Sequence, residues 1–253
     1  MDGSFLSQPK VVAAARQFVC VRLTTYENKA EAGLLKAICP TGSGELENTV
    51  FTILTPDGKR QLARASRSAR EVFGDADRMA ETMNRVARWY KPGPTTKQEL
   101  PGLPTVANVR LAINVAACDN QPLVLLFSKD AATRRSLEQA LKPLAWSEEF
   151  RGRFIYADAS GEKELSAIEG ARRETGVLVI QPDRFGLAGR VLSSAPAGAS
   201  DKALAKCLRD GAVMHRPQVE LFRDHVRDGR RAGAFWETVL PVTDPMERAA
   251  RQH

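Results

Sequence analysis

The residues best suited to chemistry stand between an apolar run and a segment with helical spacing, in LVLLFSKDAATRRSLEQAL, residues 123–141. Residues 123–127 are continuously apolar, which is typical of a buried strand, and the residues from 131 onward predict a helix. The first turn of a helix presents free amide groups and the positive end of the helix dipole, which together favour a small anion. Asp130 is the expected N-cap of this helix. The candidate residues of a ligand groove at this junction are Lys129, Asp130, Thr133 and Arg134, and ordinary solvated helix residues are the alternative interpretation.

The cysteine thiols are the second group of candidates. The chain has four cysteines, at positions 20, 39, 118 and 207, and none forms a Cys-x-x-Cys pair or accompanies a histidine cluster. The sequence therefore predicts no metal site and no cofactor, and separate free thiols suit a reducing compartment. Cys20, Cys118 and Cys207 stand among apolar residues and are expected in the core. Cys39 ends a predicted helix before Pro40 and a glycine-rich loop, so it is the candidate reactive thiol.

Charge and composition narrow the class of protein. The 253 residues are 43% hydrophobic with a net charge of +7, which is ordinary for a globular chain and favours acidic partners. The densest basic run, residues 57–70, holds no aromatic residue on which bases could stack, so a solvated face is preferred and nucleic-acid binding is an alternative. No apolar run approaches the ~20 residues that span a bilayer, and the chain as numbered opens with no secretory signal. We expect a cytoplasmic protein without membrane contact, unless the natural start lies upstream of Met1.

A stretch rich in proline and glycine divides the chain. KPGPTTKQELPGLPT, residues 91–105, holds four prolines and two glycines, which interrupt the hydrogen bonding of helices and strands and predict a linker. The predicted domains are residues 1–90 and 106–212, followed by a tail, residues 213–253. We expect the tail to form a helix and a strand-like segment that pack on a domain, with dimerisation as the alternative.

Both halves predict strands that alternate with helices. The first half predicts a strand at FVCVRL, residues 18–23, and a later hairpin around a Pro-Asp-Gly turn. The second half predicts strands at 123–127 and 153–159, a helix at 161–174, a hairpin at 176–194 and a closing helix at 200–213. The spacing from Thr49 to Pro56 repeats from Thr175 to Pro182, and an aspartate follows each proline. This echo favours two copies of one α/β fold, a mixed sheet flanked by helices, over chance similarity.

The order of these elements resembles the thioredoxin-like superfamily. LVLLFSKDAATRRSLEQAL is similar to that family's first strand and active-site helix, and VLVIQPDRFGLAGRVL is similar to its later hairpin. SFLSQPKVVAAARQFVCVRL and VFTILTPDGK resemble one thioredoxin-like subgroup. The resemblance covers most of residues 4–90 and 107–212, and it implies two thioredoxin-like units.

The resemblance breaks at the residues that would carry the family's chemistry. The family places a dithiol at the start of the first helix, where the helix dipole favours the thiolate, and here that place holds residues 129–135. The family's cis-proline position corresponds to Thr49, or the adjacent Asn48, and to Thr175. We add Thr49 and Thr175 to the groove candidates, and we expect no dithiol exchange by the family mechanism.

The first half also lacks the strand that, in this family, lies between the strands represented by residues 18–23 and 49–54. Its absence would leave two rows of backbone groups unpaired. Three repairs are open: direct pairing of the two strands, entry of GAFWETVLPV at residues 233–242, or a natural start further upstream. We expect the upstream reading frame to encode a strand with a Cys-x-x-Cys motif or its remnant.

These features predict a thioredoxin-like protein without a dithiol active site that serves as a protein-binding or scaffold module. The alternative is a thiol-disulfide oxidoreductase whose Cys-x-x-Cys lies upstream of Met1 or which uses Cys39. The sequence therefore leaves open whether the chain is an enzyme. A protein is the expected partner, and a homodimer through the tail or an open sheet edge is a further alternative.

Overall fold

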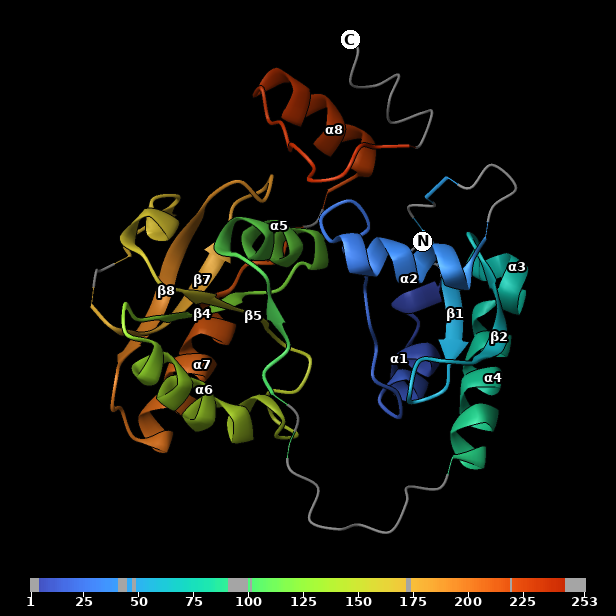
Figure 1. The fold of residues 1–253 in the computed structure, drawn as a ribbon, viewed down its shortest axis with the longest axis horizontal. Coiled ribbons are helices and arrows are strands. Elements are labelled where there is room, and N and C mark those ends of the chain that lie inside the picture. The colour runs from blue at the N-terminus through green and yellow to red at the C-terminus, as the bar shows by residue number, and fades with distance from the viewer. Residues whose placement is uncertain are drawn as a thin grey trace. The chain divides into compact units, whose positions relative to one another are not determined.

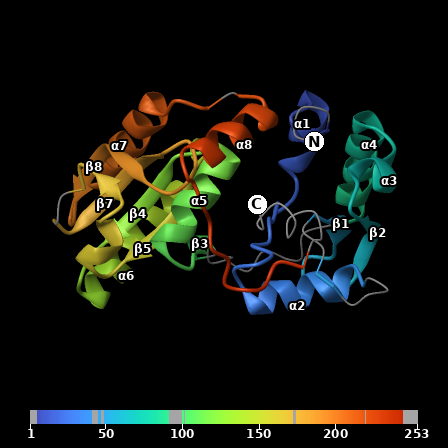
Figure 2. The same ribbon diagram turned by 90° about the horizontal axis from the view of Figure 1, so that it is seen from above.

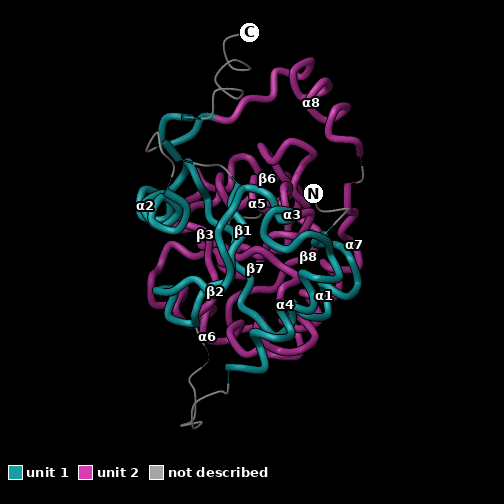
Figure 3. The backbone as a smooth tube through the Cα atoms, turned by 90° about the vertical axis from the view of Figure 1, so that its right-hand side faces the viewer, with its two compact units in different colours: residues 1–96, 237–253 teal, residues 97–236 magenta. Residues whose placement is uncertain are grey.

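The computed structural model describes residues 5–40, 45–46, 49–90, 100, 102–171, 174–218 and 220–243. The chain divides into two compact units, which Figure 3 draws in different colours. Unit 1 comprises residues 1–96 and 237–253, and unit 2 comprises residues 97–236. Each unit is described below by itself.

Unit 2 is built on a mixed six-stranded sheet with helices on both faces (Figure 1). The strands follow the spatial order β3 (Thr105–Val106), β5 (Ile155–Ala159), β4 (Leu123–Phe127), β7 (Gly176–Pro182), β8 (Gly189–Pro196) and β6 (Ile168–Glu169). Strands β3, β5 and β4 are parallel, β7 runs antiparallel to β4, and β8 runs antiparallel to β7. The prediction that residues 123–127 form an inner strand is confirmed.

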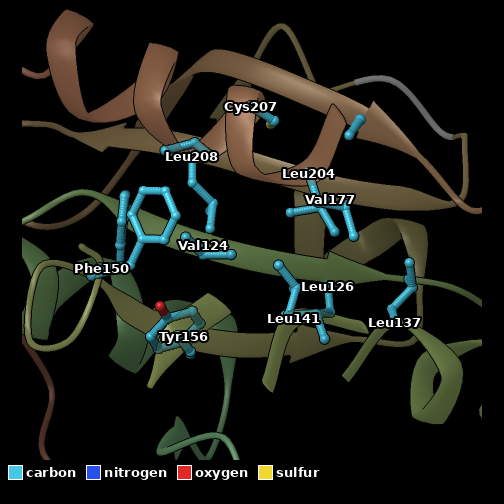
Figure 4. Close-up of a cluster of buried hydrophobic side chains, with 14 of the residues drawn as sticks. Val124, Leu126, Leu137, Leu141, Phe150, Tyr156, Val177, Leu204, Cys207 and Leu208 are labelled. Atoms are coloured by element: carbon cyan, nitrogen blue, oxygen red, sulfur yellow. The ribbon is translucent and has the colours of Figure 1, made fainter. Parts of the chain in front are cut away.

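Alternate residues of the central strands face two separate apolar layers. Val124 and Leu126 pack toward α6 (Ala131–Ala145) and α7 (Asp201–Met214), in the cluster that Figure 4 shows. Leu123, Leu125 and Phe127 pack instead toward α5 (Val109–Asp119). All five residues of β4 are at most 1% exposed, because helices cover both faces of this strand. This two-sided cover explains the uninterrupted apolar run in the sequence.

The predicted helix at residues 161–174 is wrong. The chain there forms a short 3₁₀ turn, Glu162–Leu165, and then the two-residue strand β6, which pairs with β8. The Ser166 hydroxyl donates to the Lys163 carbonyl at 2.7 Å, and Gly170 adopts a positive φ of 75°. These features end the helical path after one turn.

Unit 1 holds a smaller sheet. Hairpin β1 (Phe51–Leu54) and β2 (Gln61–Ser66) pairs antiparallel, and helices surround it: α1 (Pro9–Ala15), α2 (Lys29–Ile38), α3 (Ala69–Phe73) and α4 (Ala76–Trp89). One apolar cluster joins α1, α3 and α4 to β1, and a second joins α2 to Leu23, Leu46 and Val50. Figure 2 accordingly draws α1 and α4 on one side of the hairpin and α2 on the other.

The prediction of a strand at residues 18–23 is wrong. The segment is extended, but it pairs with no described strand, and Val19 and Val21 are 84% and 72% exposed. A strand needs a hydrogen-bonded neighbour, and the composition of the segment could not supply one. The expected burial of Cys20 and Cys118 is also wrong, since both are exposed, whereas Cys207 is buried as predicted.

The tail divides between the two units. Its helix is α8 (Phe222–Arg231) in unit 2, and its last described residues, 237–243, belong to unit 1. There the Leu240 amide donates to the Tyr26 carbonyl at 2.8 Å, and the Thr243 hydroxyl donates to the Leu46 carbonyl at 3.0 Å. The repair in which residues 233–242 enter the sheet of the first half is wrong, because these residues pair with no described strand.

Ionic contacts hold α8 against the turn between β7 and β8. The Arg184 guanidinium on that turn donates to the carboxylates of Glu220 and Asp228, the latter at 2.9 Å. The His225 ring contacts Glu220 at 2.6 Å and lies 5.3 Å from the ring of Phe185. Hydrogen bonds from Arg184 and His225 hold the pKa of Glu220 at about 2, well below its ordinary value. The carboxylate therefore stabilises docking fully above its ordinary pKa, and this contribution is lost only as the pH falls toward 2.

Replacement of Gly211 should destabilise unit 2. A Cβ at this position of α7 would meet Cβ of Val179 at 2.7 Å, so Gly211→Ala should lower the free energy of unfolding by about 1–3 kcal/mol. Gly33 of α2 is the control, because a Cβ there meets nothing within 4 Å and Gly33→Ala should be neutral or stabilising by up to about 1 kcal/mol. Urea denaturation measures both variants, and an unchanged Gly211→Ala protein would contradict this close packing.

Loss of the Arg184 side chain should release α8. In Arg184→Gln, Glu220 and Asp228 lose their shared cation, so hydrogen exchange of the α8 amides should accelerate while exchange in β4 stays the same. Arg190→Gln is the matched control, because Arg190 on β8 is exposed and makes no ion pair with a described residue. Equal exchange of α8 in the two variants would show that ionic contacts do not hold this helix.

Candidate functional site

The site with the richest side-chain chemistry lies where β4 ends and α6 begins. Ser128 continues the strand by one residue, is 2% exposed, and donates its amide to the Ala159 carbonyl at 3.1 Å. Its hydroxyl accepts the amide of Asp130 at 3.1 Å and so fixes the turn into the helix. Buried Ser128 thereby joins the core strand to the first turn of α6, although no sequence pattern singled it out.

Asp130 caps α6, as predicted. Its carboxylate accepts two hydrogen bonds from Thr133, one from the amide and one from the hydroxyl, both at 2.7 Å. These bonds stabilise the charged form and lower the pKa of Asp130 below its ordinary value. A carboxylate held charged in this way suits capping rather than proton donation.

Two basic side chains of the junction point to structural partners. The Lys129 ammonium contacts Glu162 at 2.5 Å, which ties the junction to the loop after β5. The Arg134 guanidinium donates to the Ser128 carbonyl at 2.6 Å and so reaches back across the first turn. Lys129 is largely exposed even in this pair, so a ligand can still meet its charge.

The two threonine candidates lie in different units. Gly176 pairs with Phe127 in the sheet register, so the preceding Thr175 lies at the same sheet edge as Lys129 and Asp130. Its carbonyl accepts the amide of Ala197 at 3.0 Å, and all peptide bonds among the described residues are trans. Thr49 precedes β1 in unit 1, so it does not belong to the groove of unit 2. The prediction thus combined two positions that lie in separate units.

Asp158 is a further carboxylate of this region that the sequence analysis missed. It stands on β5 one residue before Ala159 and shares a strand face with Tyr156, which packs in the α6–α7 cluster. Desolvation, followed by the charge of Glu138, raises its pKa above the ordinary value, while Arg134 acts in the opposite direction. The alternation of residues in RFIYADA could have placed Asp158 on this face.

The thiols offer no reactive pair. All four cysteines are free. Cys207 is buried on α7 beside the Ser193 hydroxyl, and burial raises the pKa of its thiol. Cys118 lies on α5, and Cys20 and Cys39 lie in unit 1, where Cys39 is half-buried at the end of α2. Among the described residues, no three side chains of the metal-binding types converge.

Comparison of the chain with protein-family models, curated proteins and solved structures finds no match. Within the described part of the chain, no helix is long and apolar enough to cross a membrane.

Removal of the cap should weaken unit 2 in a pH-dependent way. Asp130→Ala leaves the first-turn amide of Thr133 without its acceptor, so the variant should unfold at lower urea concentration than the wild type near neutral pH. Because folding lowers the pKa of Asp130, the advantage of the wild type is complete above the pKa of an unfolded aspartate and is lost as the pH falls below it. Asp130→Asn keeps an acceptor oxygen and is the matched control. A difference that persists unchanged at low pH would contradict the role of the charged cap.

Proposed function

We propose that this protein is a thioredoxin-like binding or scaffold module that works without a dithiol and recognises a protein partner at the β4–α6 junction. The observation that carries the proposal is the junction itself, where a central parallel strand feeds a long helix at the sheet edge. In open α/β sheets, ligands bind outside the carboxyl ends of such strands. The sheet order, with an antiparallel hairpin beside the central strand, supports the thioredoxin-like assignment of unit 2.

The first turn of α6 supports binding rather than redox chemistry. Its exposed residues Ala131 and Ala132 have small side chains, so the backbone of an extended peptide can approach the first turn of the helix. Lys129 and Arg134 flank this turn with positive charge, and Thr133 adds a hydroxyl. A catalytic dithiol would need a thiol at this turn. The Thr133 hydroxyl stands there instead, and it already donates to the capping carboxylate of Asp130.

Unit 1 supports the proposal of a second, partial copy. Elements of this unit follow the same order as elements of unit 2. The order in unit 1 is α1, the extended segment 18–23, α2, hairpin β1–β2 and the 14-residue α4. The order in unit 2 is α6, β5, the 3₁₀ turn, hairpin β7–β8 and the 14-residue α7. In both hairpins the turn aspartate accepts a backbone amide, from Lys59 to Asp57 and from Leu187 to Asp183. The repeated Thr-to-Pro-Asp spacing thus falls on a hairpin in each unit, with Pro56 in the turn after β1 and Pro182 at the end of β7.

Peptide selection tests the binding site. Peptides selected from a phage-displayed random library against the full chain should lose affinity for Ala131→Trp, because the indole fills the space beside the first turn. Gln139→Trp is the matched control, since Gln139 is exposed on the same helix further from the junction. Peptides that bind both variants equally would place recognition elsewhere.

Insulin reduction by dithiothreitol tests the absence of redox catalysis. We expect the wild type and Cys39→Ser to leave the uncatalysed rate unchanged, because no cysteine stands at the junction. Catalysis that Cys39→Ser abolishes would overturn the proposal in favour of an oxidoreductase.

A further inference from the structure

Unit 1 presents two extended backbone edges that pair with no described strand. Residues 18–23 form an extended segment, and the backbone groups of Val19, Val21 and Leu23 hydrogen-bond to no described residue. Strand β1 pairs with β2 on one side, and no described strand pairs with its other side. Extended backbone with unused donors and acceptors is a template for another strand.

The two edges face the same interior. Phe18, at the start of the segment, and Phe51, at the start of β1, pack against one apolar cluster. Figures 1 and 2 both draw the segment on the side of β1 that is remote from β2. Residues 18–23 and β1 therefore lie like two strands of one sheet, and no described strand pairs with both of them.

Unit 2 contains the strand that would complete such a sheet. There β4 lies between β5 and β7, parallel to β5 and antiparallel to β7, with Leu123 paired to both Ile155 and Ile180. By chain order, residues 18–23 correspond to β5 and β1 corresponds to β7. The place of β4 is the one that unit 1 leaves without a strand among its described residues.

We propose that unit 1 binds an extended segment of a partner protein between residues 18–23 and β1, parallel to the former and antiparallel to the latter. The inference rests on the proposed function in one respect, that unit 1 is a partial copy of unit 2. Main-chain hydrogen bonds to both edges supply the recognition, as in other cases of strand addition.

The packing of unit 1 defines the core of the partner segment. The cluster of α1 and α4 lies on one side of the hairpin and the cluster of α2 on the other (Figure 2). An inserted strand is covered on both faces, so it needs apolar side chains at successive positions rather than at alternate ones. The β4 run Leu-Val-Leu-Leu-Phe is the matching chemistry within this chain.

Charge defines the residues that precede that core. The unit 2 register puts the N-terminal end of the middle strand beside the start of β5 and the end of β7. The corresponding places in unit 1 carry exposed Arg16, before the segment, and exposed Lys59 and Arg60, in the turn after β1. The carboxylate of Asp57 offsets only part of the positive charge of these three side chains. The site therefore favours a partner with carboxylates just before its apolar run.

Fluorescence anisotropy with the full chain tests the site. The probe is a fluorescein-labelled peptide with two aspartates, then Leu-Val-Leu-Leu-Phe, then lysines for solubility. Binding should be saturable, and a peptide with proline at the central leucine should bind at least about tenfold more weakly, because proline removes a donor and resists a central strand. Lysines in place of the aspartates should also weaken binding, and the double variant Arg16→Glu with Lys59→Glu should reverse that preference.

Variants of the exposed segment separate this site from the β4–α6 junction. Val21→Pro should weaken the probe at least about tenfold, whereas Val21→Thr keeps the backbone donor and should bind within about threefold of the wild type. Val21 is exposed, so both variants should keep the wild-type thermal midpoint. Hydrogen exchange should show new protection of Val19, Val21 and Thr52 in the complex.

Three outcomes would overturn the inference. Equal binding to wild type and Val21→Pro would place the probe elsewhere. Loss of binding in Ala131→Trp alone would assign the probe to the β4–α6 junction, which would support the proposed function and remove the second site. A chain that self-associates without the probe, and that Val21→Pro makes monomeric, would identify a second copy as the occupant.

Discussion

The pairing of the backbone groups of β4 is the interaction on which unit 2 depends. Buried amides and carbonyls need partners, and β4 has β5 on one side and β7 on the other. Because β5 also pairs with β3 and β7 also pairs with β8, the sheet continues outward on either side of β4. The same pairing leaves both faces of β4 free for helices, so its side chains can be apolar throughout.

After the end of β4 the chain passes from the buried core to the surface. Ser128 keeps the last strand hydrogen bond and also anchors the cap, so α6 begins at a fixed place and direction. The Asp130 carboxylate accepts the amide and the hydroxyl of Thr133. Lys129 contacts Glu162 of the 3₁₀ turn, and Arg134 donates to the Ser128 carbonyl. The result is a preordered junction without a thiol, in which the cations Lys129 and Arg134 lie beside the carboxylates of Asp130, Glu162 and Asp158.

Unit 1 has no strand that is paired on both sides among its described residues. Its hairpin pairs on one side, and its extended segment keeps valine side chains in solvent. An isolated two-stranded hairpin is marginally stable, so the helices packed on both of its faces supply most of the burial. The two units have similar element orders but differ in their sheets. Unit 2 has the central strand β4, whereas unit 1 has no strand between residues 18–23 and β1 among its described residues.

The sequence by itself determined the elements whose signals are local. The continuous apolar run at 123–127, the capping residue Asp130 and the Pro-Asp turn residues identify a strand, a helix start and the hairpins, because these patterns reflect the backbone within a few residues. The α/β class follows from the same kind of signal. The predicted linker at 91–105 lies mostly outside the described residues, and its last residue, Thr105, belongs to β3. Only the tertiary structure decided whether FVCVRL was a strand, since strand formation needs a partner distant in sequence. It also decided the exposure of Cys20 and Cys118, the raised pKa of Asp158 and the ionic docking of α8, because each depends on which remote groups come close in space.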